Sequence, residues 1–276
     1  MKFWKLHGIG NDFIAIDGRF DNRLSSEYTE LAKEVCHRKF SVGADGLLVV
    51  KNSKKADIEM IYYNADGSRA AMCGNGIRCF VKFVYDNNII NKEEFSVDTL
   101  DGIKKIKISI KNNEILSVRV NMGKGSFLCK DIPVNCDKEK FIKEKVYILD
   151  KEFTINSMLM GVPHTVIFLD KLELDEVHKY GKEIEKNKIF PQGTNVNFVE
   201  IKDENNMYVS TWERGCGYTL GCGTGMSASA VIANYLGKVN NSVNVTSQGG
   251  CVKIDIEDFV YMTGPAVKIC EGTLEV

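Results

Sequence analysis

Long apolar runs are missing from this sequence. No stretch approaches the roughly 20 apolar residues that a membrane-spanning helix needs, so no transmembrane helix is expected. Near the first residue, Lys2 and Lys5 are followed by glycines and polar residues at positions 8–12, which interrupt the apolar core of any signal peptide. We therefore expect a cytoplasmic protein.

Long runs of one charge are missing as well. The 36 Lys and Arg residues nearly balance the 37 Asp and Glu residues, which gives a net charge of −1. Such a balance offers no extended basic surface to nucleic acid or to an anionic membrane. We expect neither as a partner.

Histidine is scarce, and the Cys-x-x-Cys motif of thiol-redox proteins is absent. The four histidines are too scattered for a histidine metal cluster. The nine cysteines form an odd number in a chain without an expected secretion signal, which argues against a disulfide framework. We expect most to be small buried residues, including Cys36, Cys129, Cys136, Cys251 and Cys270.

A Cys-Gly-x-Gly motif is present twice, beginning at Cys73 and at Cys222. An apolar stretch follows each motif and predicts a buried helix, at residues 77–85 and 226–236. The start of a helix favours negative charge, which makes a thiolate more accessible there. The motifs predict two reactive thiols in equivalent positions.

The repeat extends beyond these motifs. Residues 7–17 align with 160–170, residues 43–49 with 193–199, and residues 64–76 with 213–225. The order is the same and the spacing nearly constant, and the period is that of a domain rather than of a solenoid repeat. We interpret the chain as two homologous domains with an active site between them.

The remaining pattern predicts many short strands around one buried helix in each half, an α+β fold. A helix is predicted at 25–37, and residues 137–145 form either a short helix or a linker. The last residues are expected to return as a strand to the first domain, so the domains are 1–121 plus 266–276, and 122–265. Strands are predicted at residues 13–16, 47–50, 58–63, 95–122 (as hairpins), 165–169, 196–201, 207–212, 243–245, 252–256 and 259–262.

Two facing thiols could invert the α-carbon of an amino acid. One thiolate would remove the α-proton from one face while a thiol returns a proton to the other. Backbone amides next to the motif glycines would hold the substrate carboxylate and stabilise the carbanion-like transition state. This chemistry requires no organic cofactor.

Several other interpretations compete with it. Both cysteines could be inert helix-start residues. Cys73, Cys79, Cys216 and Cys222 could bind zinc, but their pairs are separated by five residues instead of the usual two to four. A thiol-redox protein is a further alternative, but the Cys-x-x-Cys motif is absent. A nucleotide site at Gly223 would need a preceding apolar strand and an acidic residue about 20 positions later, and neither is present.

Polar residues near the motifs are further candidates. His164 follows Pro163 in the segment that aligns with Asn11, so it is either structural or supports the site. The residues around Asn64 could merely form a turn. Glu213 and Arg214 could form a surface ion pair, or could bind an amino group and a carboxylate of a ligand.

These segments closely resemble the diaminopimelate epimerase family, over nearly the whole chain. The matching residues are 7–13, 64–68, 72–79, 163–164, 193–198, 213–215 and 222–225. The resemblance implies a cofactor-independent epimerase that interconverts L,L- and meso-diaminopimelate for lysine and peptidoglycan precursors. It also implies a homodimer whose subunits have two pseudo-symmetric domains, each a curved, mostly antiparallel sheet around a central helix.

The resemblance also implies roles for individual residues. Cys73 and Cys222 would be the acid/base thiols, with no metal, and His164 and Glu213 would tune them. The carboxylate at the reacting centre would be held by Gly74, Asn75, Gly223 and Thr224. The rest of the substrate would be held by Asn11, Asn64, Asn195, Glu213 and Arg214.

Two positions depart from the family pattern. Many members have Asn where this chain has Val162, and some have Gln where it has Gly46. Both positions are linked to substrate recognition, so a racemase of the same fold for another amino acid, such as histidine, is the nearest alternative. A non-catalytic zinc or thiol-redox protein is a more distant one.

Overall fold

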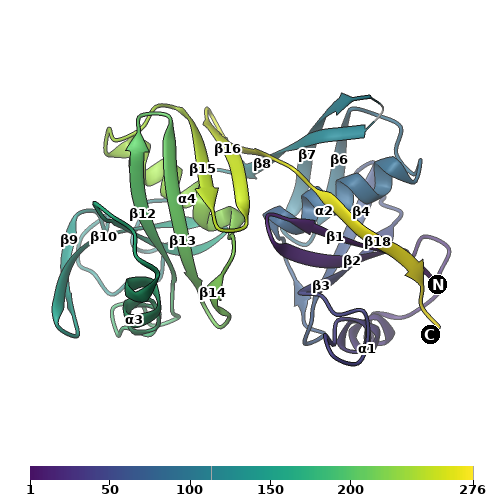
Figure 1. Cartoon of the computed structure of the whole chain (residues 1–276), viewed down its shortest axis with the longest axis horizontal. Coiled ribbons are helices and arrows are strands. Elements are labelled where there is room, and N and C mark those ends of the chain that lie inside the picture. Colours follow the sequence, from purple (N-terminus) through teal and green to yellow (C-terminus); the bar gives the residue numbers. More distant parts are fainter. Residues whose placement is uncertain (113, 276) are drawn as a thin grey trace. The chain divides into compact units, whose positions relative to one another are not determined.

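The computed structural model describes residues 1–112 and 114–275, which divide into two compact units (Figure 1). Unit 1 comprises Met1–Asn121 together with Thr263–Val276, and unit 2 comprises Met122–Met262. The chain re-enters unit 1 at Thr263 rather than at residue 266. Within the described residues, no helix has the length and apolar character needed to cross a membrane.

The first part of the chain and its last strand form one set of elements. They are β1 (Lys2–Gly8), β2 (Asn11–Asp17), α1 (Ser25–Val35), β3 (Gly46–Lys51), β4 (Ile58–Asn64), β5 (Arg69–Ala70), α2 (Gly74–Asp86), β6 (Glu94–Thr99), β7 (Gly102–Lys111), β8 (Glu114–Gly123) and β18 (Val267–Thr273). Strands β1–β2, β3–β4, β4–β5 and β6–β7 pair antiparallel, whereas β2–β3 and β4–β6 pair parallel.

The second set repeats this order. Its elements are β9 (Glu144–Ile148), β10 (Lys151–Met160), β11 (Val162–Phe168), α3 (Leu174–Glu185), β12 (Asn195–Asp203), β13 (Asn206–Glu213), β14 (Gly217–Thr219), α4 (Gly223–Tyr235), β15 (Ser242–Ser247), β16 (Gly250–Ile256) and β17 (Val260–Gly264). From β10 to β16 each pairing has the same sense as its counterpart between β1 and β7. This is the predicted α+β fold with an internal duplication.

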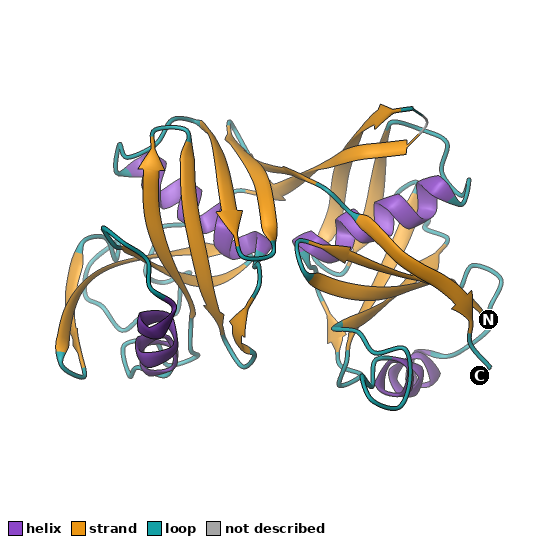
Figure 2. Ribbon diagram, viewed as in Figure 1, coloured by secondary structure: helices purple, strands orange, loops and turns teal. Residues whose placement is uncertain are grey.

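Each sheet has one helix on each face (Figure 2). In unit 1, Ile14 and Ile16 of β2 pack with α1, while the intervening residue Phe13 lies beside α2, because side chains alternate along a strand. Helix α2 is buried nearly all round, including Ile77 and Phe80. Helix α4 is lined by small residues and is also largely buried. These two central helices begin directly after Cys73 and Cys222.

Some sequence predictions were wrong or incomplete. Of the two alternatives for residues 137–145, the helix does not form, and β9 begins at Glu144. The strands β1, β5, β9, β10 and β14 and the helix α3 were not predicted. Cys36 and Cys129 are buried as expected, but Cys251 and Cys270 are exposed. Cys251 follows the alternation of β16, in which Val252 points inward, so its own side chain points outward.

Candidate functional site

Cys73 is the N-cap of α2. Its backbone is extended (φ −137°, ψ 123°), and its sulfur accepts a hydrogen bond from the Gly76 N–H at 3.4 Å. A sulfur in this position satisfies one of the unpaired amides at the positive end of the helix dipole. The fold therefore places the first motif cysteine where negative charge on sulfur is stabilised.

Asn11, at the start of β2, joins this group. Its Oδ1 lies 3.4 Å from the Cys73 sulfur and 3.4 Å from Nδ2 of Asn75. Its own Nδ2 donates to Oδ2 of Asp45 at 2.6 Å. The structure thus brings together Asn11, Cys73 and Asn75, with Gly74 as the first helical residue between the last two.

A charged cluster behind Asn11 was not predicted from the sequence. Arg38 donates two hydrogen bonds to Asp12, at 3.0 and 2.7 Å, and one to Asp45 at 2.6 Å. Burial alone would raise the pKa of Asp12, but the hydrogen bonds and charges of Arg38 and Lys5 outweigh it and lower that pKa. Asp45 is held by Arg38 and by the Asp12 N–H, which it accepts at 3.2 Å, so its carboxylate can orient the Asn11 amide.

Arg78 is a second residue that sequence reasoning missed. It is fully buried, and its guanidinium donates to the Gly74 carbonyl at 2.9 Å, to Oδ1 of Asn75 at 2.9 Å and to the Pro265 carbonyl at 3.1 Å. Burial lowers the pKa of Arg78, and the charges of Cys79 and Cys73 partly offset that effect. Arg78 thus holds the first turn of α2, and its charge acts on Cys73.

Asn64 is held by its own turn instead. At the end of β4, its Nδ2 donates to Oγ of Ser68 at 2.9 Å, and its carbonyl accepts the Gly67 N–H at 2.9 Å. This geometry is compatible with a turn-forming role of Asn64 and with a role in substrate binding. A substrate role for Asn64 stays a prediction.

In unit 2, Cys222 is the N-cap of α4, again with an extended backbone (φ −104°, ψ 110°). Unlike Cys73, it makes no side-chain cap hydrogen bond, and its sulfur lies 3.4 Å from the Thr224 hydroxyl. Cys222 is buried, with 7% of its surface exposed. Gly223 begins the helix, and its carbonyl accepts the Ser227 hydroxyl at 2.9 Å.

His164 lies near the start of β11 and is completely buried. Burial lowers its pKa to about 3, and the charge of Arg214 acts in the same direction. The imidazole is therefore neutral at physiological pH. Its Nδ1 lies 3.2 Å from Nδ2 of Asn197, a residue that the sequence did not single out.

The segment after β13 is fixed by hydrogen bonds to its backbone. Oδ1 of Asn195 accepts the Arg214 N–H at 2.9 Å, and the carboxylate of Glu185 accepts the Gly215 N–H at 2.9 Å. Arg214 also donates from Nη1 to the Gln192 carbonyl, at 2.9 Å. Glu213 accepts the Thr219 hydroxyl at 2.6 Å. Asn195 at the start of β12, Glu213 at the end of β13 and Arg214 just after it are thus neighbours, and hydrogen bonds restrain the segment that follows β13.

The two positions that depart from the family pattern differ in their surroundings. A Cβ on Gly46 would lie 2.5 Å from the Tyr62 ring and 2.6 Å from the Tyr63 carbonyl oxygen, so a larger residue does not fit there without a shift. Val162 is 36% exposed at the start of β11.

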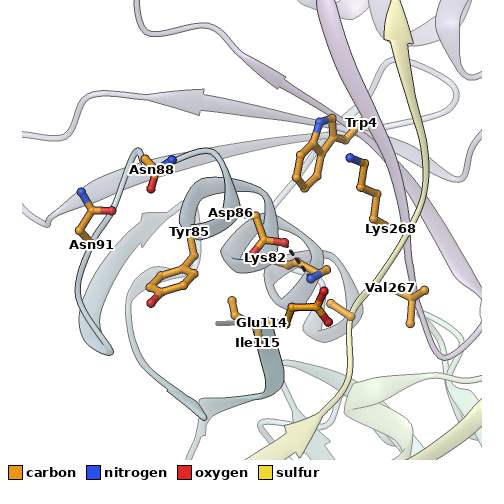
Figure 3. A pocket seen from close by; sticks show the side chains of 11 residues that line it. Trp4, Lys82, Tyr85, Asp86, Asn88, Asn91, Glu114, Ile115, Val267 and Lys268 are labelled. Carbon is orange, nitrogen blue, oxygen red and sulfur yellow. Dashed lines mark hydrogen bonds and ion pairs between the residues drawn. The ribbon is translucent and has the colours of Figure 1, made fainter. Parts of the chain in front are cut away.

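A surface cavity of about 800 Å³ in unit 1 contains none of these residues (Figure 3). It lies beside the C-terminal half of α2, where Lys82 forms an ion pair with Asp86 at 2.8 Å and Lys268 lies over the Trp4 ring. Across residues 1–112 and 114–275, no three His, Cys, Asp or Glu side chains gather as a metal-ligand group.

The chain is similar to known proteins over nearly its whole length. The family model described as diaminopimelate epimerase matches residues 3–128 and 156–269. A diaminopimelate epimerase of Alkaliphilus metalliredigens is 51% identical over 99% of this chain and 96% of its own length. That of Clostridium perfringens is 50% identical over 99% of both.

Solved structures share the fold at low identity. A hydroxyproline epimerase from Agrobacterium vitis superposes with a TM-score of 0.72 at 14% identity, over 99% of this chain and 91% of that one. A phenazine biosynthesis protein of the PhzF family from Bacillus anthracis gives 0.70 at 16% identity, over 100% and 99%. Because the family model matches most of the chain and these two relatives are 51% and 50% identical to it, the chain belongs to the diaminopimelate epimerase family.

Proposed function

We propose that this protein interconverts L,L- and meso-diaminopimelate in the synthesis of lysine and peptidoglycan precursors. Two relatives that are 51% and 50% identical over nearly their full length are named diaminopimelate epimerase. The structural observation that supports it most directly is the placement of Cys73 and Cys222. Each caps the buried central helix of one of two units that share the same order of elements.

In the proposed mechanism the two cysteines act on opposite faces of one α-carbon. The thiolate of one cysteine takes the α-proton, and the electrons of the broken C–H bond remain on the substrate as a carbanion-like transition state. The thiol of the other cysteine gives its proton to the opposite face, which inverts the centre and leaves a thiolate there. One cysteine gains a proton while the other loses one, so the protein and substrate together gain or lose none. In the reverse reaction the two cysteines exchange roles.

The helix starts would stabilise the transition state. The amides of Gly74, Asn75, Gly223 and Thr224 lie in the first turns of α2 and α4, where backbone N–H groups lack partners within the helix. They would bind the carboxylate at the reacting centre and the charge that develops on it.

The polar groups around the helices would bind the rest of the substrate. We assign this role to Asn11, Asn64, Asn195, Glu213 and Arg214. Arg214 and Glu213 offer a cation and an anion, which suit the distal carboxylate and amino group of diaminopimelate. His164 and Glu213 would also tune the thiols.

We further propose a cytoplasmic homodimer with this small amino acid as its substrate and with no organic cofactor. The last strand, β18, exposes Val267 and Ile269, which a second copy could cover. Sedimentation equilibrium tests the dimer, since a single species at the mass of one chain would contradict it.

The decisive experiment is incubation with L,L-diaminopimelate in heavy water without pyridoxal phosphate. We expect the meso isomer to appear with one deuterium at the inverted carbon, because a solvent-exchanged thiol supplies the new proton. Lysine, proline and histidine serve as comparison substrates. A site that pairs a distal amino-acid group should reject substrates without it, since its own polar groups would be left unpaired.

Two outcomes would contradict the proposal differently. If none of the four amino acids incorporated deuterium, the proposed epimerase function would be refuted. A higher kcat/KM for histidine or another single-headed amino acid would retain the thiol chemistry, and would show that Val162 marks a different substrate.

A further inference from the structure

Asn197 of β12 forms a hydrogen-bond network at the core of unit 2. It is fully buried, and its Nδ2 lies 3.1 Å from the Thr165 carbonyl and 3.2 Å from Nδ1 of His164. Its Oδ1 accepts the Thr211 hydroxyl at 3.0 Å. All the polar atoms of this side chain are therefore engaged.

This network determines where the proton of His164 is. A carbonyl oxygen can only accept, so the Asn197 atom that faces the Thr165 carbonyl must be the NH₂ group. The same NH₂ group faces Nδ1 of His164, which must then accept. In a neutral imidazole the other nitrogen carries the proton, so His164 is the Nε2–H tautomer.

The same asparagine lies against the first turn of α4. A Cβ built on Gly225 would come within 2.3 Å of Oδ1 of Asn197 and within 3.3 Å of Cβ of Cys222. Asn197 thus bridges the helix start that carries Cys222 and the ring of His164. The Nε2 atom of that ring is buried and has no hydrogen-bond partner within the described part of the chain.

We infer that Asn197 is a positioning residue that locks His164 into the neutral Nε2–H tautomer, so that His164 serves the site as a hydrogen-bond donor and not as a base. This inference rests on the proposed function, because it takes the first turn of α4 as part of the reaction site. A buried N–H donor favours a negatively charged acceptor, such as a thiolate or a carboxylate.

A fixed neutral donor has a chemical advantage here. The cation of Arg214 and the burial of the ring both disfavour an imidazolium, so His164 does not compete with the thiols for the substrate proton. It can stabilise negative charge without changing its own protonation during the reaction. The division of roles is that cysteine moves the proton and histidine donates a hydrogen bond.

The test is the protonation state of His164, read from two-bond ¹H–¹⁵N spectra of the full-length protein. The chain has only four histidines, and the missing signals in His164→Asn identify the ring. We expect one Nε2–H tautomer that does not titrate between pH 5 and 8. A proton on Nδ1, or a charged ring at neutral pH, would overturn the inference.

Asn197→Asp tests the cause. A carboxylate accepts where the amide donates, so it should move the proton to Nδ1 or charge the ring, and kcat/KM should fall at least tenfold with an altered pH profile. Asn156→Asp is the matched control. Asn156 is also a buried asparagine, with Nδ2 bonded to the Val166 carbonyl at 3.2 Å and Oδ1 to the Lys143 N–H at 2.9 Å.

The control should leave the His164 spectrum unchanged. If Asn197→Asp kept both the Nε2–H tautomer and wild-type kcat/KM, Asn197 would not be a positioning residue. If that variant fails to fold, the wild-type spectrum alone still decides the tautomer. The spectrum needs no turnover, so a protein without epimerase activity would refute the proposed function and leave the tautomer question answerable.

Discussion

At the scale of single residues, the nine cysteines of this chain are not chemically alike. Burial raises the pKa of Cys36 to about 12 and that of Cys129 to about 11, and it raises the pKa of Cys79 as well. Such thiols stay protonated and unreactive at physiological pH. Cys73 and Cys222 differ because each stands at the start of a buried helix.

Replacing either motif cysteine should abolish epimerisation. We expect Cys73→Ala and Cys222→Ala each to lower kcat/KM by about three orders of magnitude or more, since neither thiol can serve the other face. Cys73→Ala also removes the cap hydrogen bond from the Gly76 N–H, so it should lower the stability by about 1 kcal/mol. Cys222 makes no side-chain cap hydrogen bond, so Cys222→Ala should change thermal unfolding less. Near-normal turnover by either variant would refute the two-thiol mechanism.

Arg78 should affect catalysis because it holds the first turn of α2, which follows Cys73. Arg78→Met leaves the acceptors at Gly74, Asn75 and Pro265 without their donor. Each buried acceptor left unsatisfied lowers the free energy of unfolding by about 1–3 kcal/mol. We expect lower stability in urea and a fall in kcat that exceeds any rise in KM. Lys82→Met, which removes a cation of the same helix from its partly buried ion pair with Asp86, is the control.

A wild-type kcat in folded Arg78→Met would show that the guanidinium contributes stability alone. The residue illustrates what the sequence could and could not predict. The placement of Cys73 and Cys222 at helix starts was predicted from a short local motif. The Pro265 contact of Arg78 and the contacts of Asp45 and Asn197 join segments far apart in the chain. A side chain's partners across such distances are not encoded in its neighbours.

At the scale of elements, the two central helices begin alike but pack differently. A Cβ on Gly76 of α2 would meet the Phe13 ring at 3.4 Å, whereas one on Gly225 of α4 would meet Oδ1 of Asn197 at 2.3 Å. An aromatic ring edge at that distance needs only a small shift. The buried amide cannot retreat without breaking its hydrogen bonds to Thr165 and Thr211.

Alanine at these two glycines should therefore have different effects on stability. Gly76→Ala should be nearly neutral, because the gain in helix propensity of about 1 kcal/mol offsets a tight contact. Gly225→Ala should destabilise by about 1–3 kcal/mol through overpacking and should lower kcat. Urea denaturation of both variants measures this. Equal effects would mean that Asn197 moves freely.

Elements differed in how far the sequence specified them. The strands β12 and β13 were predicted within one or two residues of their observed bounds. Helix α3 was missed although Val177, Tyr180 and Ile184 do follow a helical spacing, because its many charged residues hid that pattern. Strands β1 and β10 were missed although each forms a hairpin with a neighbouring strand, β1 with β2 and β10 with β9 and β11.

At the scale of the whole molecule, the two units complete the same edge of their sheets from different parts of the chain. In unit 2, β9 directly precedes its antiparallel partner β10, whereas in unit 1 the partner of β1 is β18, from the last residues. The sequence predicted this returning strand from the length left after the second copy. It could not predict the register, which includes a bulge between Lys5 and Leu6.

Unit 1 should depend on that returning strand. Gly272 packs against the Phe3 ring, where a Cβ would come within 2.8 Å. Leu274 is buried in the hydrophobic core that the side chains of α1 help to form. Removing residues 267–276 would expose the edge of β1 and this apolar surface, so we expect the urea midpoint to fall and activity to be lost. Cys270→Ser, an exposed position on the same strand, is the control and should match wild type. A truncated chain that unfolds at the wild-type urea concentration would show that β18 is dispensable for unit 1.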